Sequence, residues 1–453
     1  MSAISRHVAH YALSHSDFSD DAYAKAKTFV LDSLGVGIAG SKAPFNEAVY
    51  ATVSSFGAGE AAHLWGRAEK APTASAAYLN GFQIHSMEYD CVHEPAVVHP
   101  MATIFAALSA EADRQGGVSG LALLEAVIVA VDIAVELGVA VTSPLKFFRP
   151  ATAGLFGATL GIARLRGFDE DTAMSAMGCA LSQCAGVMQP HVEGKPTLPV
   201  QIAGAARAAV VACDLAQNGL HGPESSLEGP FGYFNMFEDE AEAGVLLSRL
   251  GKVHRITEVS WKPFPTGRAA QGGITLIQLL REQGVTAEKL KSLTLTAPPI
   301  IPRLVNRPAK VGMSANYARL CFPYLGAITL LRGTVSLNDF TEGDLNNLEI
   351  LDIASRISVE TNNVTDPAEF VPQSVTAALA NGDKESAKID RLFGAPVFPL
   401  TQEQHLQKFR DCVAFGLRKV NAKVVADGLI ETVDNLEQSD NCSELFRLAA
   451  GLK

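Results

Sequence analysis

The sequence predicts a mainly α-helical protein that carries a second, smaller α+β domain. Ala-, Leu- and Gly-rich segments with apolar residues at helical spacing fill the chain before Gly284. After Gly284, three runs alternate apolar and polar residues and are rich in β-branched side chains, at residues 290–297, 357–361 and 371–379. With 453 residues the chain is too long for one hydrophobic core, so we expect two domains.

The first long helix is expected to follow Ser19, a favoured N-cap residue, and to run through residues 24–34. Its end is rich in glycine, which lets backbones approach closely. Asp32 in this segment is either a functional carboxylate or, as we favour, a structural hydrogen-bond acceptor. Further helices are expected at residues 71–79, 106–114, 121–137, 154–166, 203–216, 269–283, 317–332 and 343–354, and a last group after Thr401.

Composition and charge exclude several classes of protein. Apolar residues make up 48% of the chain and charged residues 19%, which is typical of a folded globular protein. A net charge of −11 argues against a nucleic-acid partner. Seven cysteines without a CxxC pair indicate reduced thiols and a cytoplasmic protein. No signal peptide is recognisable, and the apolar segment 121–141 contains three carboxylates, so we expect a buried helix and no membrane partner.

Ionisable residues are concentrated between residues 80 and 100. This stretch lies between apolar segments and holds His85, Glu88, Asp90, His93, Glu94 and His99. Buried ionisable groups tend to have shifted pKa values, so the cluster is either a reactive site or a polar loop broken by prolines. His99 precedes Pro100 at the predicted start of a helix, where backbone N–H donors disfavour its cation and leave it available as a base.

Cofactor motifs are absent from the sequence. No GxGxxG follows a β-type run and no GxxxxGK[ST] occurs, so a nucleotide cofactor is not expected. A metal site built from Asp90, His93 and His99 remains an alternative, although no HExxH-like spacing supports it. We therefore expect no metal and no other cofactor.

Four segments, in order, resemble the MmgE/PrpD family. They are the LD-x-LG stretch at 31–35, the NG-x(3)-H-x(2)-E-Y-D stretch with its later His-Pro at 80–100, the KPFP motif at 262–265 with Arg268, and the Cys-Phe-Pro-Tyr segment ending at Tyr324. Members of this family include 2-methylcitrate dehydratase, cis-aconitate decarboxylase and iminodisuccinate epimerase. The resemblance covers nearly the full length.

The resemblance implies a fold and a set of partners. A large all-helical domain would comprise residues 1–268 and 398–453, and a smaller α+β domain, residues 269–397, would lie over it as a lid. The site would lie in the cleft between them. The resemblance also implies a homodimer, a small polycarboxylate substrate and no cofactor.

Roles for individual residues follow from the same resemblance. It implies catalytic roles for His99, Asp90, Lys262 and Tyr324, and substrate binding by Arg268, Gln271, Arg149, Lys195 and His93. A base near neutrality and fixed cations are what removal of a proton next to a carboxylate requires. Without the resemblance, Arg149 would be read as a surface arginine, Lys262 as a loop lysine and Tyr324 as a half-buried helix aromatic.

Departures from the family pattern favour one reaction class. Cys91 stands where the dehydratases and decarboxylases have a second aspartate, Phe148 or Arg149 replaces a histidine, and Gln271 replaces another. These losses weaken protonation of a leaving group but spare proton exchange. The sequence therefore favours a two-base epimerase acting on iminodisuccinate, which carries four carboxylates. A dehydratase-like or decarboxylase-like lyase, or a non-catalytic helical interaction protein, are the alternatives.

Overall fold

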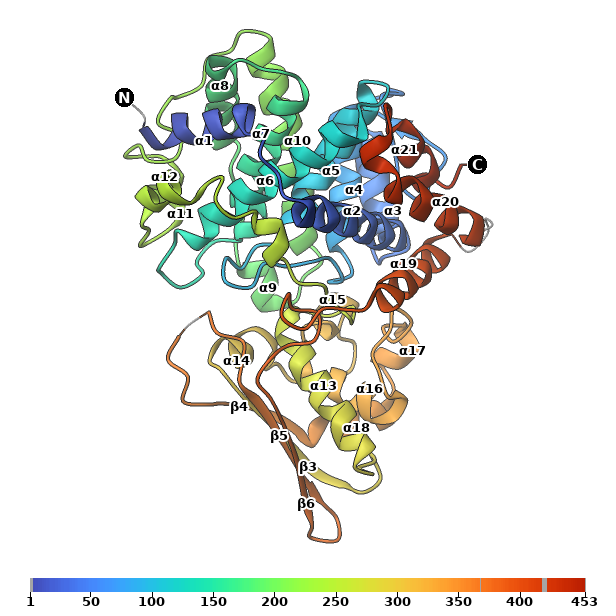
Figure 1. Cartoon of the computed structure of the whole chain (residues 1–453). Helices are drawn as coiled ribbons and strands as arrows, with labels where there is room; N and C mark the ends of the chain where they lie inside the picture. The colour runs from blue at the N-terminus through green and yellow to red at the C-terminus, as the bar shows by residue number, and fades with distance from the viewer. Residues whose placement is uncertain (1–2, 367, 418–421, 453) are drawn as a thin grey trace.

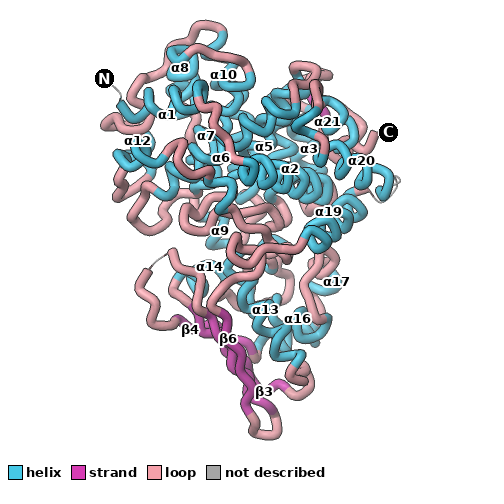
Figure 2. Tube along the Cα trace, in the orientation of Figure 1, coloured by secondary structure: helices cyan, strands magenta, loops and turns pink. Residues whose placement is uncertain are grey.

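The computed structural model describes residues 3–366, 368–417 and 422–452. A large helical domain lies above a smaller domain that contains a sheet covered by helices (Figures 1 and 2). This arrangement confirms the predicted fold class. The division at residues 268 and 398 stays a prediction.

Long apolar helices form the centre of the helical domain. α4 (Thr73–His85), α5 (Pro100–Arg114), α6 (Gly120–Val139), α7 (Arg149–Leu165) and α10 (Leu198–Gln217) pack against one another. Their buried faces consist mostly of alanine, leucine, isoleucine and valine, which allows close helix packing. By length and composition α10 alone among the described helices is able to cross a membrane, but it packs against α4, α5, α7 and α8 as a core helix.

The other elements of this domain surround that centre. α2 (Asp20–Gly40) begins where predicted, because Ser19 accepts a hydrogen bond from the Ala22 N–H. The remaining elements are α1 (Ala3–Ser14), α3 (Asn46–Ser54), β1 (Ala62–His63), β2 (Lys70–Ala71), α8 (Glu170–Leu181), α9 (Gln189–Glu193), α11 (Tyr233–Phe237), α12 (Leu246–Arg249) and the 3-10 helices Ala243–Val245 and Arg255–Glu258.

The smaller domain is built on a four-stranded mixed sheet. Its order is β4 (Ile357–Thr361), β3 (Leu290–Ala297), β5 (Gln373–Leu379) and β6 (Lys384–Ile389). β3 pairs parallel with β4 and antiparallel with β5, which places Leu295 beside Val359 and Val375. The sequence prediction missed β6. None of its residues is buried, and exposed residues alternate with half-buried ones. α13 (Arg268–Glu282) and α16 (Phe322–Arg332) contribute to the same apolar core.

Short helices complete this domain. The helix expected at residues 317–332 is divided into α15 (Ala315–Ala318) and α16, because Pro323 favours a new helix start. The segment expected at 343–354 is similarly divided into α17 (Glu342–Leu345) and α18 (Leu348–Ser355), where Asn347 caps the second helix. α14 (Ile300–Val305) lies close to the helical domain (Figure 1).

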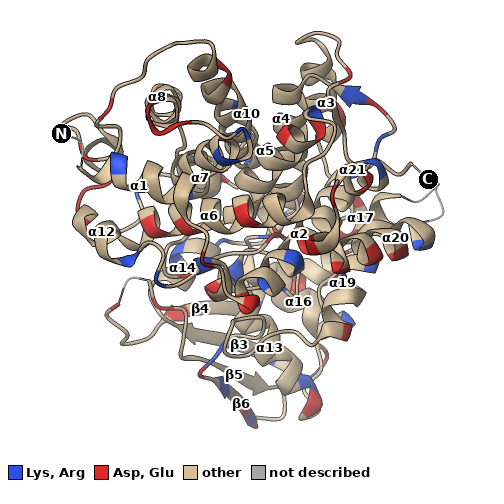
Figure 3. Ribbon diagram, turned by 45° about the horizontal axis from the view of Figure 1, so that its top comes forward, with Lys and Arg blue, Asp and Glu red and all other residues tan. Residues whose placement is uncertain are grey.

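The last helices return to the helical domain. α19 (Gln402–Gly416) packs along α2 and begins with a capping box formed by Thr401 and Gln404. α20 (Ala422–Asp434), the 3-10 helix Leu436–Gln438 and α21 (Ser443–Ala449) follow. In Figure 3, acidic and basic residues are interspersed along the ribbon of the part that the structure describes.

Candidate active site

A cavity lies where the two domains meet. Its accessible volume is about 70 Å³. Residues from both domains line it, among them His85, Glu88, His99, His191, Arg268 and Leu304. The cavity lies at the predicted cleft location, and its lining includes three imidazoles and a guanidinium.

Local backbone geometry brings the 80–100 stretch to this cavity. α4 ends at His85, and α5 begins at Pro100, so that His99 occupies the N-cap position. Glu88 and Val97, in the connecting loop, have positive φ angles of 52° and 51°. Residues other than glycine rarely adopt this backbone conformation, and such strain tends to occur at functional sites. Both strained residues line the cavity.

Asp90 organises the two cavity histidines. Its Oδ2 lies 3.0 Å from His85 Nδ1 and 3.2 Å from His99 Nδ1. His99 Nδ1 also lies 3.0 Å from the Cys91 carbonyl oxygen. Since both neighbours of this nitrogen are acceptors, Nδ1 of His99 carries the proton. Its Nε2, without a hydrogen-bond partner among the described residues, is left with a free lone pair in the neutral ring.

The two histidines have opposite pKa shifts. Burial and nearby Lys262 lower the pKa of His99, against the opposing effect of Asp90. Burial also disfavours the charged form of His85, but Asp90 and Glu88 outweigh it, and the pKa of His85 is raised. Two groups whose pKa values diverge within one site can serve as base and acid. His99 therefore suits the base and His85 the acid.

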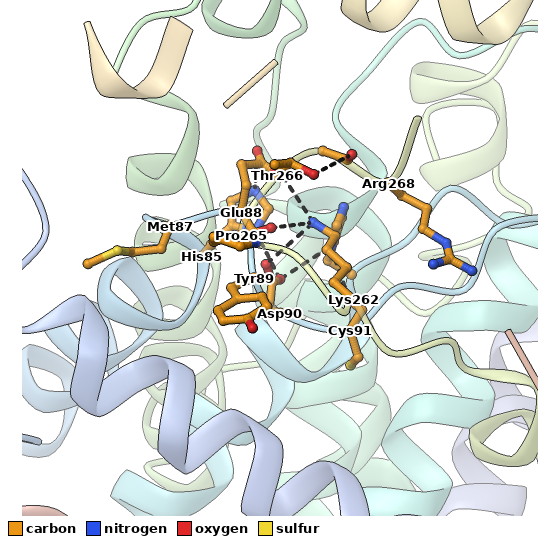
Figure 4. A network of polar contacts seen from close by, with 12 residues as sticks. His85, Met87, Glu88, Tyr89, Asp90, Cys91, Lys262, Pro265, Thr266 and Arg268 are labelled. Atoms are coloured by element: carbon orange, nitrogen blue, oxygen red, sulfur yellow. Dashed lines mark hydrogen bonds and ion pairs between the residues drawn. The ribbon is translucent and has the colours of Figure 1, made fainter. Parts of the chain in front are cut away.

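Lys262 forms a buried ion pair behind the cavity wall. Its side chain is 0% exposed, and its Nζ lies 3.1 Å from Glu88 Oε2 and 3.9 Å from Asp90 Oδ1. It also donates to the Glu88 carbonyl oxygen. Burial would raise the pKa of Glu88, but Lys262 and the two histidines lower it to about 2. Figure 4 shows Lys262 close to Glu88 and Asp90.

Arg268 is held by the loop around the KPFP motif and points away from the Lys262 pair (Figure 4). Its Nε donates to Glu94, and its Nη1 donates to the carbonyl oxygens of Trp261 and Phe393 and to the side chain of Gln271. Nη2 is buried and has no partner within the described ranges. One donor of a cavity-lining guanidinium is therefore available for an anion.

Comparison with known proteins shows the family to which the chain belongs. Residues 2–246 match the MmgE/PrpD N-terminal domain, and residues 264–431 match the MmgE/PrpD C-terminal domain. The chain belongs to the MmgE/PrpD family. It is 26% identical over 459 residues to the cis-aconitate decarboxylase of Mus musculus, with 97% of this chain and 92% of that protein covered. The human cis-aconitate decarboxylase is 26% identical over 469 residues, with 97% and 93% covered.

A fungal relative is more distant. The cis-aconitate decarboxylase-like protein oryM of Aspergillus oryzae is 23% identical over 470 residues, with 97% of this chain and 95% of that protein covered. Each of these relatives therefore matches this MmgE/PrpD chain over nearly its whole length.

Several predicted site residues of this MmgE/PrpD protein lie outside the cavity lining. Arg149 is buried in a bidentate pair with Glu238, at 2.9 and 3.1 Å. His93 contacts Glu258, 3.2 Å from its Nε2, while its Nδ1 accepts from the Ala96 N–H. Lys195 is exposed beyond α9.

Gln271 and Tyr324 also lie away from the cavity lining. The Gln271 amide donates to the Phe264 and Thr266 carbonyl oxygens, so it shapes the KPFP loop. Tyr324 is buried in the core of the smaller domain, where its hydroxyl donates to the Asp339 carbonyl oxygen, 2.5 Å away. The structure therefore brings together His99, Asp90, Lys262 and Arg268 but not the other predicted residues.

Sequence reasoning missed other residues of this site. His85 and Glu88 were in the ionisable cluster, but nothing in their spacing shows that they face the cavity. His191, on α9, lines the cavity, and burial and Arg307 lower its pKa to about 4. Arg319 donates to the Met87 and Pro265 carbonyl oxygens and so joins the two loops. Its sequence position beside the Cys-Phe-Pro-Tyr segment was the one available signal.

A possible metal-binding group differs from the one considered from the sequence. His85, Asp90 and His99 each offer a ligand atom, and these atoms lie within 4.8 Å of one another. His93 is not among them, because it faces Glu258. The Nδ1 atoms of both histidines contact the same oxygen of Asp90, and each Nδ1 serves as a hydrogen-bond donor to it.

Proposed function

We propose that this protein is a cofactor-independent enzyme that removes and returns a proton at a carbon next to a carboxylate in a small polycarboxylate. The observation that carries the proposal is the state of His99. Its Nδ1 is held by Asp90 and the Cys91 carbonyl oxygen, and its lowered pKa leaves the ring neutral. A neutral imidazole with one free nitrogen at a cavity wall suits a general base.

The charge distribution supports an anionic substrate. The protein carries a net charge of −11, yet Arg268 presents an unpaired donor at the cavity. The raised pKa of His85 favours its cation, which would add a second positive charge. Removing a proton next to a carboxylate places negative charge on that carboxylate, and fixed cations stabilise it. The relatives named above are cis-aconitate decarboxylases, and their named substrate is also a polycarboxylate.

Epimerisation is the reaction class that we propose, with iminodisuccinate as the substrate type. An epimerase needs one group to take the proton and another to return it on the opposite face. His99 and His191 are the two groups that we propose for these steps. His99 lines the cavity from the 80–100 stretch, and His191 lines it from α9, a separate element. The positions where lyases of the family carry further histidines hold Phe148 and Gln271 here, and Gln271 is engaged by backbone carbonyls.

Decarboxylation is a second candidate, and the similarity to cis-aconitate decarboxylases favours it. A decarboxylase must protonate carbon after CO2 leaves. His85, as a cation 4.9 Å from His99 between ring centroids, suits such a donor. A 2-methylcitrate dehydratase-like reaction would in addition need an acid that protonates a departing hydroxyl.

One NMR experiment separates these reactions. The protein is incubated in D2O with single stereoisomers of iminodisuccinate, with cis-aconitate and with 2-methylcitrate in separate samples. The proposal expects deuterium at one α-carbon of iminodisuccinate together with the inverted isomer. Release of CO2 from cis-aconitate, or a new olefinic signal from 2-methylcitrate, without exchange in iminodisuccinate would replace the epimerase by the corresponding lyase.

The proposal also includes a homodimer in the cytoplasm. Sedimentation of the purified protein tests the dimer. A monomer that retains full activity would contradict this part alone.

A further inference from the structure

A second unpaired guanidinium donor lies beside the cavity. Arg307 follows α14, and its Nη2 donates to the His191 carbonyl oxygen at 3.1 Å and to the Leu304 carbonyl oxygen at 3.2 Å. Both of these residues line the cavity. Nη1 of Arg307 is buried and has no hydrogen-bond partner in the parts of the chain that the structure describes. The side chain also stacks over Tyr317, 5.1 Å from the ring centroid.

The Arg307 side chain is half-buried, and the burial of its Nη1 without a partner costs free energy. Among the described residues no carboxylate forms an ion pair with Arg307, and burial lowers its pKa. A buried cation without a counter-ion is unfavourable, and a buried donor without an acceptor costs further free energy. An anion beside Nη1 would supply both missing partners. Since the neighbouring His191 and Leu304 face the cavity, that anion would come from a ligand held there.

We propose that Arg307 binds a substrate carboxylate remote from the reacting carbon and thereby selects polycarboxylates with three or more carboxylates over dicarboxylates. This inference rests on the proposed function for its substrate class, but not on the reaction class. Arg268 would hold one carboxylate through Nη2, and Arg307 would hold another through Nη1. Arg268 is the first residue of α13 and Arg307 follows α14, so both anchors come from the chain after the KPFP motif.

The same contact affects His191. Burial first, and then Arg307 and Arg303, lower its pKa, while Glu88 has the opposite effect and His85 lowers it slightly. A carboxylate beside Arg307 would neutralise part of the positive charge that His191 faces. Binding of a polycarboxylate would then make His191 a better proton carrier than it is in the empty cavity.

Binding measurements by isothermal titration calorimetry test the inference without any turnover. The ligands are tricarballylate, a saturated tricarboxylate, and succinate, a dicarboxylate. The wild-type protein is expected to bind tricarballylate more tightly. Arg307→Gln is expected to weaken tricarballylate binding by about 10- to 100-fold, the range for a charge-assisted hydrogen bond, and to leave succinate binding within about twofold.

Two control variants show whether weaker binding comes from the lost charge of Arg307 or from a disturbed fold. Ser314→Ala removes the hydrogen bond from Ser314 to the Gly194 carbonyl oxygen, together with the cap that Ser314 gives to α15, without changing charge. Arg356→Gln removes one positive charge elsewhere in the smaller domain, where Arg356 pairs with Asp352. Both are expected to bind tricarballylate like the wild type. Thermal unfolding of each variant checks that the fold is kept.

Three outcomes would overturn the inference. They are unchanged tricarballylate binding in Arg307→Gln, an equal loss for tricarballylate and succinate, or a wild-type protein that binds neither. The last outcome would also remove the polycarboxylate part of the proposed function. Selective weakening by Arg307→Gln together with no α-proton exchange in the NMR experiment would retain this inference and reject only the epimerase.

Discussion

His85 and His99 share one oxygen atom of Asp90, at 3.0 and 3.2 Å from their Nδ1 atoms, yet their pKa values shift in opposite directions. The difference arises from their second neighbours. Burial and Lys262 disfavour the cation of both rings, but His85 has Glu88 Oε1 3.8 Å from its Nε2, and this carboxylate favours its cation. One carboxylate thus orients a base and an acid side by side.

The first prediction concerns His99. His99→Asn removes the proposed base while an amide preserves part of the hydrogen bonding to Asp90. Loss of a general base typically lowers rates by about 10²–10⁴-fold, so α-proton exchange in D2O should fall by that amount. His93→Asn is the matched control, because His93 is buried against Glu258 outside the cavity lining. Equal losses in the two variants would show that the effect is structural.

The second prediction is the pH dependence of kcat/KM. The base must be unprotonated, and its pKa is lowered, so activity should fall only as pH drops through a value below the ordinary 6.5 of histidine. In the decarboxylation candidate His85 donates the proton, and its pKa is raised, so activity should fall again as pH rises through a value above 6.5. His85→Asn should remove the alkaline decline alone. A profile with its acid limb above pH 6.5 would contradict the assignment of His99.

The sequence predicted the fold class because helical periodicity and alternating strands are local signals. The strands at 290–297 and 357–361 coincide with β3 and β4. β6 was missed because only Ala387 and Ile389 of its six residues are apolar and both are only half-buried, so the alternation is weak. The Ser19 and Thr401 caps were recognised because capping depends on residues a few positions apart.

The site was predicted only in part, because burial and pairing depend on contacts distant in sequence. Arg149 was expected to bind substrate, but Glu238, 89 residues later, pairs with it. Asp32 was read as structural, and it forms a buried ion pair with Lys408 at 2.7 Å. Arg307 lies in none of the recognised motifs, and only the three-dimensional structure shows that it donates to the His191 carbonyl oxygen.

The third prediction concerns the buried pair of Lys262 and Glu88. Lys262→Met leaves the Glu88 carboxylate buried without its main partner, which typically costs about 3–5 kcal/mol of the free energy of unfolding. Lys262→Met with Glu88→Gln removes both charges and should recover most of that loss. Urea denaturation at pH 7 measures both variants. A double variant as unstable as the single one would show that packing of Lys262, not its charge, stabilises the fold.

The stability that Glu88 in this pair contributes should depend on pH in acid solution. The pKa of Glu88 is lowered to about 2 from an ordinary 4.5, so its stabilising contribution is present above pH 4.5 and is lost as pH falls towards 2. Glu88→Gln should therefore flatten the dependence of stability on pH in this interval, and denaturation at several pH values between 2 and 5 measures it. An unchanged slope would contradict the lowered pKa.

The last prediction concerns metal ions at His85, Asp90 and His99. Their ligand atoms lie within 4.8 Å of one another, but the Nδ1 atoms of both histidines contact Asp90 Oδ2, and His99 Nδ1 carries its proton between two acceptors. To be held by both Nδ1 atoms and Asp90 Oδ2, a metal ion would have to displace the Nδ1 protons and the hydrogen bonds they make, because only unprotonated imidazole nitrogens bind metals. Activity should therefore survive prolonged dialysis against EDTA.

Added Zn²⁺ should inhibit the enzyme instead, more strongly at high pH, and EDTA should reverse the inhibition. His93→Asn should be inhibited like the wild type, since His93 faces Glu258. Activity that disappears with EDTA and returns only with a divalent metal would show that the three residues hold a catalytic metal and that the proton-transfer scheme built on His99 is wrong.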